Sequence, residues 1–201
     1  MLTGITWHGH ATVRIEAGGN SIITDPYQLK ETKPADVILI THSHFDHLSL
    51  EDVEKVRSKD SVFVATADCV EQLGPATKVI APGQRIDLGN GVIVEAYPAY
   101  NVDKDFHPKA NGWVGYVVEA GGRRVYIAGD TDRIPEMKGI RCDVAFLPVG
   151  GTYTMTAEQA AAAAKDISPK LAVPMHWGNI IGTRADAERF VELCECEARV
   201  M

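Results

Sequence analysis

The sequence predicts an α/β protein in which two similar halves each build one β-sheet. Short apolar runs bounded by polar or glycine residues, such as residues 37–40 (VILI) and 143–149 (DVAFLPV), are typical of buried strands. Residues 16–19 and 119–122 both read Glu-Ala-Gly-Gly, and each lies in the turn of a strand pair that leads to an aspartate. We interpret this match as a two-fold repeat, although a coincidence of glycine-rich turns would give the same pattern.

Composition favours one domain spanning residues 1–201. A chain of 201 residues that is 45% hydrophobic can bury one sizeable core, and no linker or low-complexity segment divides it. The net charge of −7, without a lysine or arginine run, disfavours nucleic acid as a partner. No apolar stretch approaches the ~20 residues that span a bilayer, and no basic-then-apolar leader opens the chain. We therefore expect a cytoplasmic protein.

The first half begins with a hairpin over residues 12–24, with its turn at Gly18-Gly19-Asn20. Ser49 is a good N-cap for a helix whose first turn is acidic and whose end is basic, as the helix dipole prefers. Further strands are expected at residues 62–65, 79–80, 86–88 and 92–94, with a short helix over residues 67–73.

The second half follows a polar loop over residues 99–112 that is long enough to bind a ligand. Its hairpin covers residues 116–127, and the strand over residues 143–149 comes next. Thr156 and Gln159 form a capping box that opens a helix. A last core strand at residues 171–173 precedes a terminal helix that starts near Thr183 and carries an apolar stripe.

The most informative stretch is residues 41–47 (THSHFDH), directly after the strand at residues 37–40. It places three histidines and a carboxylate within six residues. Imidazole and carboxylate suit zinc and similar divalent ions without a thiolate, and a turning segment can direct such side chains to one or two cations. The alternative is a polar loop that happens to be rich in histidine. We predict that the donors of this stretch bind metal: His42, His44, Asp46 and His47.

The pattern His-x-His-x-Asp-His after a hydrophobic strand resembles the signature of the metallo-β-lactamase fold hydrolases. The resemblance continues through residues 128–131 (AGDT) and 174–178 (PMHWG), so it covers most of the chain. Residues 7–13 (WHGHATV) and 24–26 (TDP) are similar to the branch that contains the ascorbate-6-phosphate lactonases and N-acylphosphatidylethanolamine phospholipase D. The resemblance implies a four-layer αββα sandwich with two pseudo-symmetric halves, in agreement with the repeat, and fixes no substrate.

The resemblance also implies metal ligands outside the motif. From the sequence alone Asp130 could simply cap a turn, but it matches the aspartate that bridges the two metals, and His176 matches the family's last metal histidine. The third histidine of the first metal is open, because this chain has Asn101 where the branch often shows a histidine after Pro-x-x. We favour His107, six residues further on, with Asn101 or water as the alternative.

Four other polar residues are candidates for supporting roles. His8 and His10 could bind metal directly, or one could be a surface residue and the other a support for a metal ligand. His10 is the better candidate for lining the pocket, because Gly-His-Ala-Thr recurs in this branch. Asp25 is a candidate acceptor that would fix the tautomer of a metal-binding histidine. Tyr153 could donate a hydrogen bond to an oxyanion or simply pack.

The implied activity is hydrolysis of an ester, lactone, amide or phosphodiester bond in a small molecule. Two divalent ions, preferentially Zn²⁺ with Mn²⁺ or Fe²⁺ as alternatives, would activate a hydroxide that Asp46 both orients and helps to bind. Ser43 has no base other than residues committed to metal, so a serine hydrolase is disfavoured.

Two non-hydrolytic alternatives stay open. A di-iron redox protein is disfavoured because such relatives usually carry glutamate where this chain has His44 and add a flavin domain. A metal-binding sensor would be favoured if the third histidine were absent. The sequence leaves a homo-oligomer open.

Overall fold

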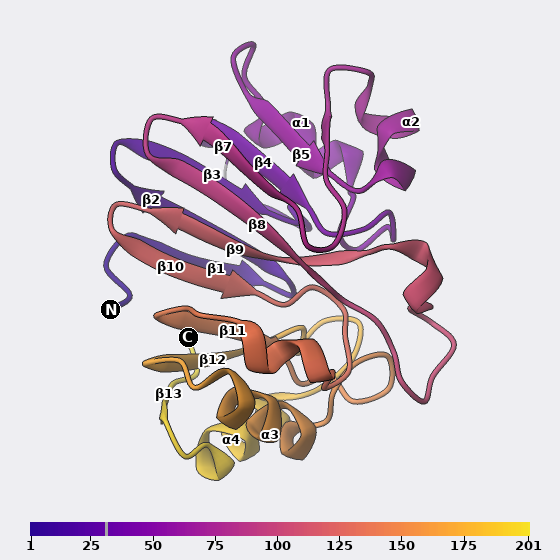
Figure 1. Ribbon diagram of the computed structural model, residues 1–201, viewed down its shortest axis with the longest axis vertical. Helices are drawn as coiled ribbons and strands as arrows, with labels where there is room; N and C mark the ends of the chain where they lie inside the picture. The colour runs from indigo at the N-terminus through magenta and orange to yellow at the C-terminus, as the bar shows by residue number, and fades with distance from the viewer. Residues whose placement is uncertain (31) are drawn as a thin grey trace.

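The computed structural model describes residues 1–30 and 32–201 and contains two mixed β-sheets that pack face to face (Figure 1). Strand order is β1-β2-β3-β4-β5-β6 in the first sheet and β13-β12-β11-β10-β9-β8-β7 in the second. The first sheet comprises β1 (Ile5–Gly9), β2 (Thr12–Ala17), β3 (Asn20–Thr24), β4 (Val37–Ile40), β5 (Val62–Ala65) and β6 (Lys78–Val79). The second comprises β7 (Arg85–Gly89), β8 (Val92–Pro98), β9 (Val114–Ala120), β10 (Arg123–Ile127), β11 (Val144–Pro148), β12 (Leu171–Met175) and β13 (Glu197–Ala198).

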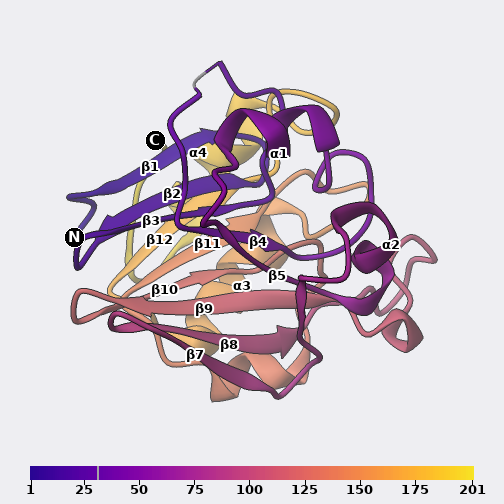
Figure 2. The same cartoon turned by 90° about the horizontal axis from the view of Figure 1, so that it is seen from above.

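Helices cover the outer faces of both sheets. Those beside the first sheet are α1 (Leu50–Val56), the 3₁₀ turn η1 (Ala67–Cys69) and α2 (Val70–Leu73). Those of the second half are the 3₁₀ turns η2 (Lys109–Asn111) and η3 (Pro135–Gly139), and the helices α3 (Ala157–Ile167) and α4 (Arg184–Leu193). Figure 2 shows the first sheet lying between α1 and the second sheet, and α3 and α4 pack on each other and on β11 and β12. The predicted αββα arrangement is therefore confirmed.

The two sheets repeat one succession of strand pairings. In the first, two antiparallel pairs from β1 to β3 are followed by three parallel pairs from β3 to β6. In the second, the strands from β8 to β13 give the same two antiparallel and three parallel pairs, and β7 adds an antiparallel edge. Each half of the chain thus builds one sheet, as the Glu-Ala-Gly-Gly repeat predicts.

The two repeated turns also touch each other. A Cβ added at Gly121 would lie 3.1 Å from the backbone nitrogen of Gly18 and 3.2 Å from the Cβ of Ala17. Gly18 and Gly121 both have left-handed backbone conformations, with φ of 61° and 57°. Glycine is suited to both positions because it adopts positive φ without a steric penalty and leaves room for the partner turn.

Side-chain alternation along the strands separates two apolar layers. In β4, Val37 and Leu39 belong to the central cluster between the sheets, whereas Ile38 and Ile40 belong to an outer cluster that also contains Val53 of α1. Such alternation follows from the two-residue period of a strand, and here both faces are apolar because both are covered.

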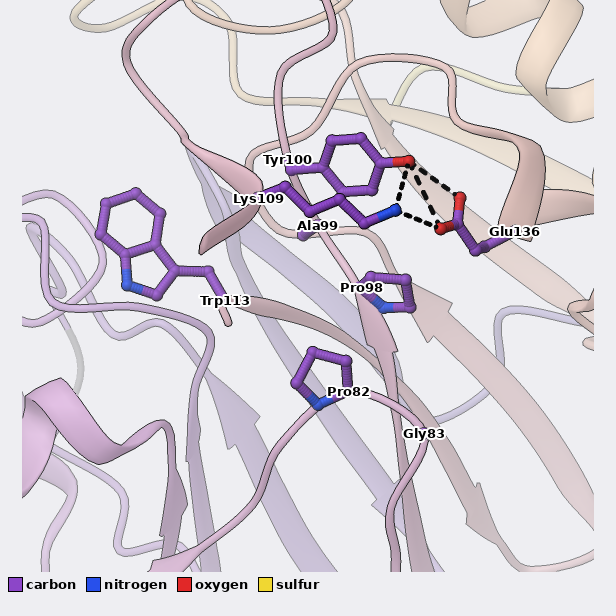
Figure 3. Close-up of a pocket in the computed structure, with 8 residues that line it drawn as sticks. All are labelled: Pro82, Gly83, Pro98, Ala99, Tyr100, Lys109, Trp113 and Glu136. Carbon is purple, nitrogen blue, oxygen red and sulfur yellow. Dashed lines mark hydrogen bonds and ion pairs between the residues drawn. The ribbon is translucent and has the colours of Figure 1, made fainter. Parts of the chain in front are cut away.

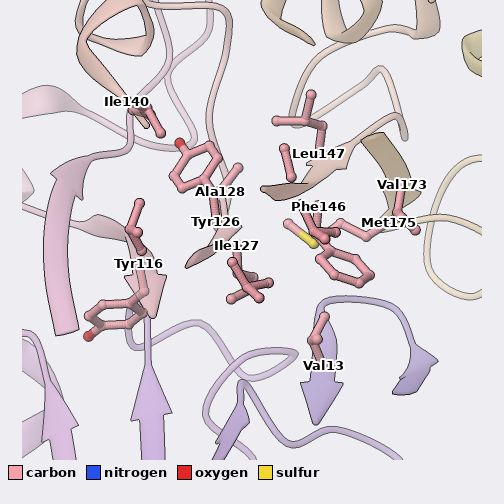
Figure 4. Packing of buried hydrophobic residues seen from close by; sticks show 14 of the residues in the cluster. Val13, Tyr116, Tyr126, Ile127, Ala128, Ile140, Phe146, Leu147, Val173 and Met175 are labelled. Atoms are coloured by element: carbon pink, nitrogen blue, oxygen red, sulfur yellow. The ribbon is translucent and has the colours of Figure 1, made fainter. Parts of the chain in front are cut away.

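The central cluster joins the sheets from both sides. Figure 4 shows Val13 of β2 facing Phe146 of β11, and both side chains are fully buried. On the outer face of the second sheet, Ala160, Ala163 and Ala164 of α3 are buried. Their small side chains let the helix lie close to the strands.

The helices begin where the capping residues predict. The side chain of Ser49 accepts a hydrogen bond from the Asp52 amide, and Thr156 and Thr183 each open a helix with a capping box. Four elements were not predicted, namely β1, β13, η3 and η2, which lies within the predicted loop over residues 99–112. β1 is an edge strand whose residues mostly lie half-exposed, so it shows no alternation, and β13 has only two residues.

The parallel strands deliver the polar motifs to one edge of the sandwich. Residues 41–47 follow β4, Asp130 lies three residues beyond β10, and His176 directly follows β12. The carboxyl ends of such strands are a common position for reactive sites in α/β folds. Among the described residues, no helix has the length and apolar character needed to cross a membrane.

The contact between the repeated turns should be measurable as stability. Gly121→Ala and Gly122→Ala both place a side chain at positive φ, at a cost of about 1 kcal/mol or more, but a Cβ at Gly122 meets no atom within 4 Å. We expect Gly121→Ala to lower the free energy of unfolding by about 1 kcal/mol more than Gly122→Ala does, because the added Cβ at position 121 is overpacked against the partner turn. Urea denaturation of both variants tests this. Equal losses would mean that the two turns do not constrain each other.

Candidate metal centre

The motif after β4 folds into a compact turn. The backbone amides of His47 and Leu48 both donate to the carbonyl oxygen of His44, at 3.0 Å and 2.8 Å. This turn brings the donors of the motif close enough to other parts of the chain to form three overlapping groups of potential metal ligands, and the third group, His42, His47 and Asp130, links the other two.

The first donor group consists of His42, His44 and His107, whose ligand atoms lie within 4.8 Å of one another. His42 Nε2 and His44 Nδ1 are 3.0 Å apart. His42 and His107 are buried, and His44 is half-buried. Three imidazoles that converge from two loops form a donor set typical of a catalytic zinc ion with an open position.

The second donor group consists of Asp46, His47, His176 and His10, again within 4.8 Å. Asp46 Oδ2 lies 3.7 Å from the Nε2 atoms of both His47 and His176. All four residues are buried. His47 comes from the motif, whereas His176 comes from the end of β12, so the group draws on both sheets.

Asp130 lies between the two groups. Its Oδ2 is 3.2 Å from His107 Nε2, while its Oδ1 is 3.2 Å from His176 Nε2 and 3.3 Å from His47 Nε2. One oxygen therefore faces each group, which is the arrangement a bridging carboxylate requires.

Gly129 permits this close approach of Asp130. A Cβ at Gly129 would lie 2.8 Å from the carbonyl oxygen of Val114 and 3.2 Å from the Cβ of Thr41. Gly129 also has a φ of 63°. The segment after β10, which carries Asp130, packs against Thr41, the first residue of the motif. This packing requires a residue without a side chain at position 129.

Asp25 holds the motif from behind. Its Oδ1 accepts a hydrogen bond from the Thr41 amide at 2.8 Å, and its Oδ2 accepts one from the Thr41 hydroxyl at 2.7 Å. The same Oδ2 lies 2.8 Å from His47 Nδ1. The predicted contact of Asp25 with a histidine of the motif is thus confirmed. It places the proton of His47 on Nδ1 and directs Nε2 toward Asp130.

The structure brings His107, not Asn101, into the first donor group. Asn101 lies behind the ring, where its Oδ1 is 3.0 Å from both the backbone nitrogen and Nδ1 of His107. The Asn101 amide nitrogen donates to the carbonyl oxygen of Tyr153 at 3.0 Å. Asn101, which the sequence offered as an alternative ligand to His107, therefore orients the imidazole of His107 instead.

His10 connects the turn between β1 and β2 to the second group. Its Nε2 lies 2.9 Å from Asp46 Oδ2, and its ring centroid is 3.9 Å from that of His176. Its carbonyl oxygen accepts a hydrogen bond from the His176 amide at 2.7 Å. His8 belongs to none of the donor groups formed by the described residues. His10 thus fixes two members of the group at once.

Trp113 supports the first group and was not identified from the sequence. Its ring centroid lies 4.7 Å from those of His42 and His44, and its Nε1 donates to Asp68 at 2.8 Å. Asp68 also accepts a hydrogen bond from the Ser43 amide at 3.2 Å. No motif marks either residue, because the contact depends on how η1 and the loop before β9 meet.

The buried charges of the site balance one another. Burial alone would raise the pKa of Asp130, but the neighbouring imidazoles of His176 and His47 hold it well below its usual range. Burial lowers the pKa of His176 and His47, but Asp130 outweighs this and raises the pKa of His176 to about 9 and that of His47 well above its ordinary value. For His42, burial dominates and lowers the pKa well below its usual value.

The donor set fits divalent metal ions. Several buried polar atoms that face one another have no hydrogen-bond partner among the described residues: His47 Nε2, His107 Nε2, His176 Nε2 and Asp130 Oδ1. Buried polar groups normally have partners, so such atoms require an explanation, and a cation provides one. Neutral imidazole and carboxylate are the ligands of zinc and of similar divalent ions.

Comparison with known proteins identifies relatives over nearly the whole chain. Residues 4–176 match the family described as beta-lactamase superfamily domain. The UPF0173 metal-dependent hydrolase of Thermoplasma acidophilum is 35% identical over 94% of this chain and 89% of its own. A crystal structure from Parabacteroides distasonis, 36% identical, superposes with a TM-score of 0.88 over 98% of this chain and 91% of its own. Igni18, a metallo hydrolase of Ignicoccus hospitalis, is 28% identical with a TM-score of 0.79 over 98% and 94% of the two chains.

Metal binding should release protons. Because the pKa of His176 is raised to about 9, this residue is protonated at pH 7 in the metal-free protein and must lose its proton to bind Zn²⁺. The apparent affinity for Zn²⁺ should therefore rise at least about tenfold for each pH unit between pH 7 and pH 9. Calorimetry at pH 7 in buffers of different ionisation enthalpy should count at least one proton released. An affinity that does not change with pH would contradict this charge balance.

Loss of His10 should weaken metal binding although the metal-free fold persists. His10→Ala removes the hydrogen bond to Asp46, and loss of such supporting contacts typically costs about 10- to 100-fold in metal affinity. Competition with a chelator gives the affinity, and circular dichroism gives the fold. His8→Ala, two residues away and outside the donor groups, is the control. Equal affinity in the two variants would remove His10 from this role.

Proposed function

The chain belongs to the beta-lactamase superfamily, and on this premise we propose that it hydrolyses a small molecule with the help of two divalent metal ions. Its relatives are named metal-dependent hydrolases, and the chain is a metal-dependent hydrolase of this superfamily. The number of ions, their identity and the bond cleaved are the parts we add.

The observation that carries the proposal is the pair of donor groups on either side of Asp130. We assign one ion to His42, His44 and His107. The second is assigned to Asp46, His47 and His176, with Asp130 shared by both. Zn²⁺ is the ion we propose, with Mn²⁺ and Fe²⁺ as alternatives, because imidazoles and carboxylates without thiolate suit all three.

Divalent ions held by these residues would lower the pKa of a coordinated water from 15.7 toward about 7 and would polarise the oxygen of the scissile bond. Asp46 would orient the attacking water. Burial raises the pKa of this carboxyl group, but hydrogen bonds from His10 and His176 outweigh burial and hold it below its usual range. Asp46 is therefore ionised at neutral pH and accepts a hydrogen bond, while His10 fixes the carboxylate in place.

The reaction class is hydrolysis of an ester, lactone, amide or phosphodiester bond. We also propose that the substrate is a small molecule rather than nucleic acid, which is consistent with the net charge of −7. The proposed location of the protein is the cytoplasm. The inward position of His107 weighs against the alternative of a non-catalytic metal sensor, which an incomplete first group would have favoured.

Metal analysis combined with turnover tests the proposal. The purified protein, remetallated with Zn²⁺, should bind two ions per chain, and His42→Ala should bind about one, because the first group loses one of its three imidazoles. The same variant should hydrolyse 4-nitrophenyl acetate at least about 100-fold more slowly, as expected when an activating metal is lost. Mass spectrometry for metal content and absorbance for turnover provide the readouts.

His8→Ala is the matched control, since it removes an imidazole two residues from His10 in the sequence but outside the donor groups. It should keep both ions and its turnover. Equal hydrolysis by the wild type and His42→Ala would refute the proposed site. Iron retained in preference to zinc, with a redox-active absorption band and no hydrolysis, would favour the di-iron alternative.

A further inference from the structure

The donor groups open into a pocket of about 310 Å³. Its wall combines metal-donor candidates with apolar side chains: His44, Phe45, Asp46, Phe106, His107, Asp130, Tyr153 and Ile180. The polar residues lie at the reacting end. The remaining wall comes from the motif, from the loop after β8 and from the loops around α3 and α4.

The apolar members of this wall are unusually exposed. Phe45, Phe106 and Ile180 have exposed fractions of 68%, 48% and 37%. The other three phenylalanines of the chain are buried, so the two exposed ones both lie at this pocket. Exposed apolar side chains that gather around a cavity mark a binding surface, because their burial by a ligand is favourable.

The aromatic part of the wall is ordered by its own packing. The ring of Phe106 meets that of Tyr153 edge to face at 4.7 Å between centroids. Phe45 lies edge-on to Tyr27 at 6.2 Å. Phe106 directly precedes His107, and Phe45 lies between His44 and Asp46, so both rings are attached to the segments that carry the donors.

Among the residues that the structure describes, no lysine or arginine lines this pocket. The two lysines on the loop of Phe106 are engaged elsewhere, because Lys104 pairs with Asp132 and Lys109 pairs with Glu136 at 2.9 Å. Figure 3 shows the Lys109 ammonium group directed at the Tyr100 hydroxyl and Glu136, in a separate pocket. A substrate with an extra anionic group would find no cationic side chain here to pair with it.

We propose that the substrate carries an uncharged apolar acyl group beside its scissile bond, and that Phe45, Phe106 and Ile180 determine this specificity. The inference rests on the proposed hydrolytic function and narrows it to carboxylic esters, lactones or amides. For an ester, the oxygen of one water forms a bond to the acyl carbon and the bond between that carbon and the leaving oxygen breaks. A carboxylate and an alcohol are released, one proton of the water passes to the leaving oxygen, and the other passes to solvent.

A pair of esters with the same leaving group tests the acyl specificity. Zinc-loaded protein is assayed with 4-nitrophenyl acetate and 4-nitrophenyl hexanoate, and with bis(4-nitrophenyl) phosphate as the anionic substrate. Burial of each added methylene favours the transition state by up to about fourfold, so kcat/KM for the hexanoate should exceed that for the acetate at least about tenfold. Both carboxylic esters should react faster than the phosphodiester.

Variants at the pocket wall assign this preference to residues. Phe106→Ala and Ile180→Ala should each lower the hexanoate-to-acetate ratio several-fold, because kcat/KM for the hexanoate should fall more than kcat/KM for the acetate. Val102→Ala is the matched control, because Val102 lies on the same loop with an exposed fraction of 65% but does not line the pocket. The variants replace exposed side chains, so unfolding temperatures should match that of the wild type.

A binding measurement separates this inference from the proposed function. 1-Hexanol, which cannot be hydrolysed, should bind the zinc-loaded protein more tightly than ethanol and perturb the NMR signals of the Phe45 and Phe106 rings, and Phe106→Ala should weaken it. Absence of turnover on all three substrates, with hexanol still bound at these rings, would refute the hydrolase proposal and support the apolar site.

The inference is overturned by equal kcat/KM for the two esters, by faster turnover of the phosphodiester, or by an unchanged ratio in both wall variants. An equal loss in Val102→Ala would likewise overturn it. A change of oligomeric state in Phe106→Ala, measured by analytical ultracentrifugation, would show that the exposed rings contact a second copy of the chain instead.

Discussion

The site depends on a carboxylate, that of Asp130, buried between imidazoles from distant parts of the chain. A buried charge is tolerated only when opposite charge or hydrogen bonds surround it, and Asp130 has His47, His107 and His176 within 3.3 Å. The backbone of Gly129 and the support of Asp25 behind the motif both serve this approach. In the metal-free protein the raised pKa values of His47 and His176 let these two imidazoles carry compensating protons, and bound metal would replace those protons. The same geometry therefore serves folding and metal binding.

Much of the fold could be predicted because local rules act on short segments. β4 coincides with residues 37–40, and Ser49, Thr156 and Thr183 each cap a helix as expected. The repeat was visible because the turns that contain Gly18 and Gly121 need the same backbone conformation. β1 could not be predicted, since an edge strand with mixed exposure shows no hydrophobic period.

The candidate metal ligands of the site could be predicted from the sequence, but most of the residues that hold these ligands in place could not. His42, His44, Asp46 and His47 follow a recognisable spacing, whereas the choice between His107 and Asn101 depended on the path of a loop. Contacts such as Trp113 with the histidines join segments far apart in sequence, and no local pattern encodes them. Pocket walls made of loops are for the same reason visible only after folding.

The meeting of Gly18 with Gly121 has the character of an isologous contact, in which equivalent positions of two units face each other across an approximate dyad. Two identical half-chains joined in this way would keep the sandwich but would present the same donors twice. In this chain the halves have diverged, since one contributes the histidine-rich turn and the other contributes Asp130 and His176. Tandem covalent linkage therefore allows a division of labour that a symmetric pair of halves could not achieve.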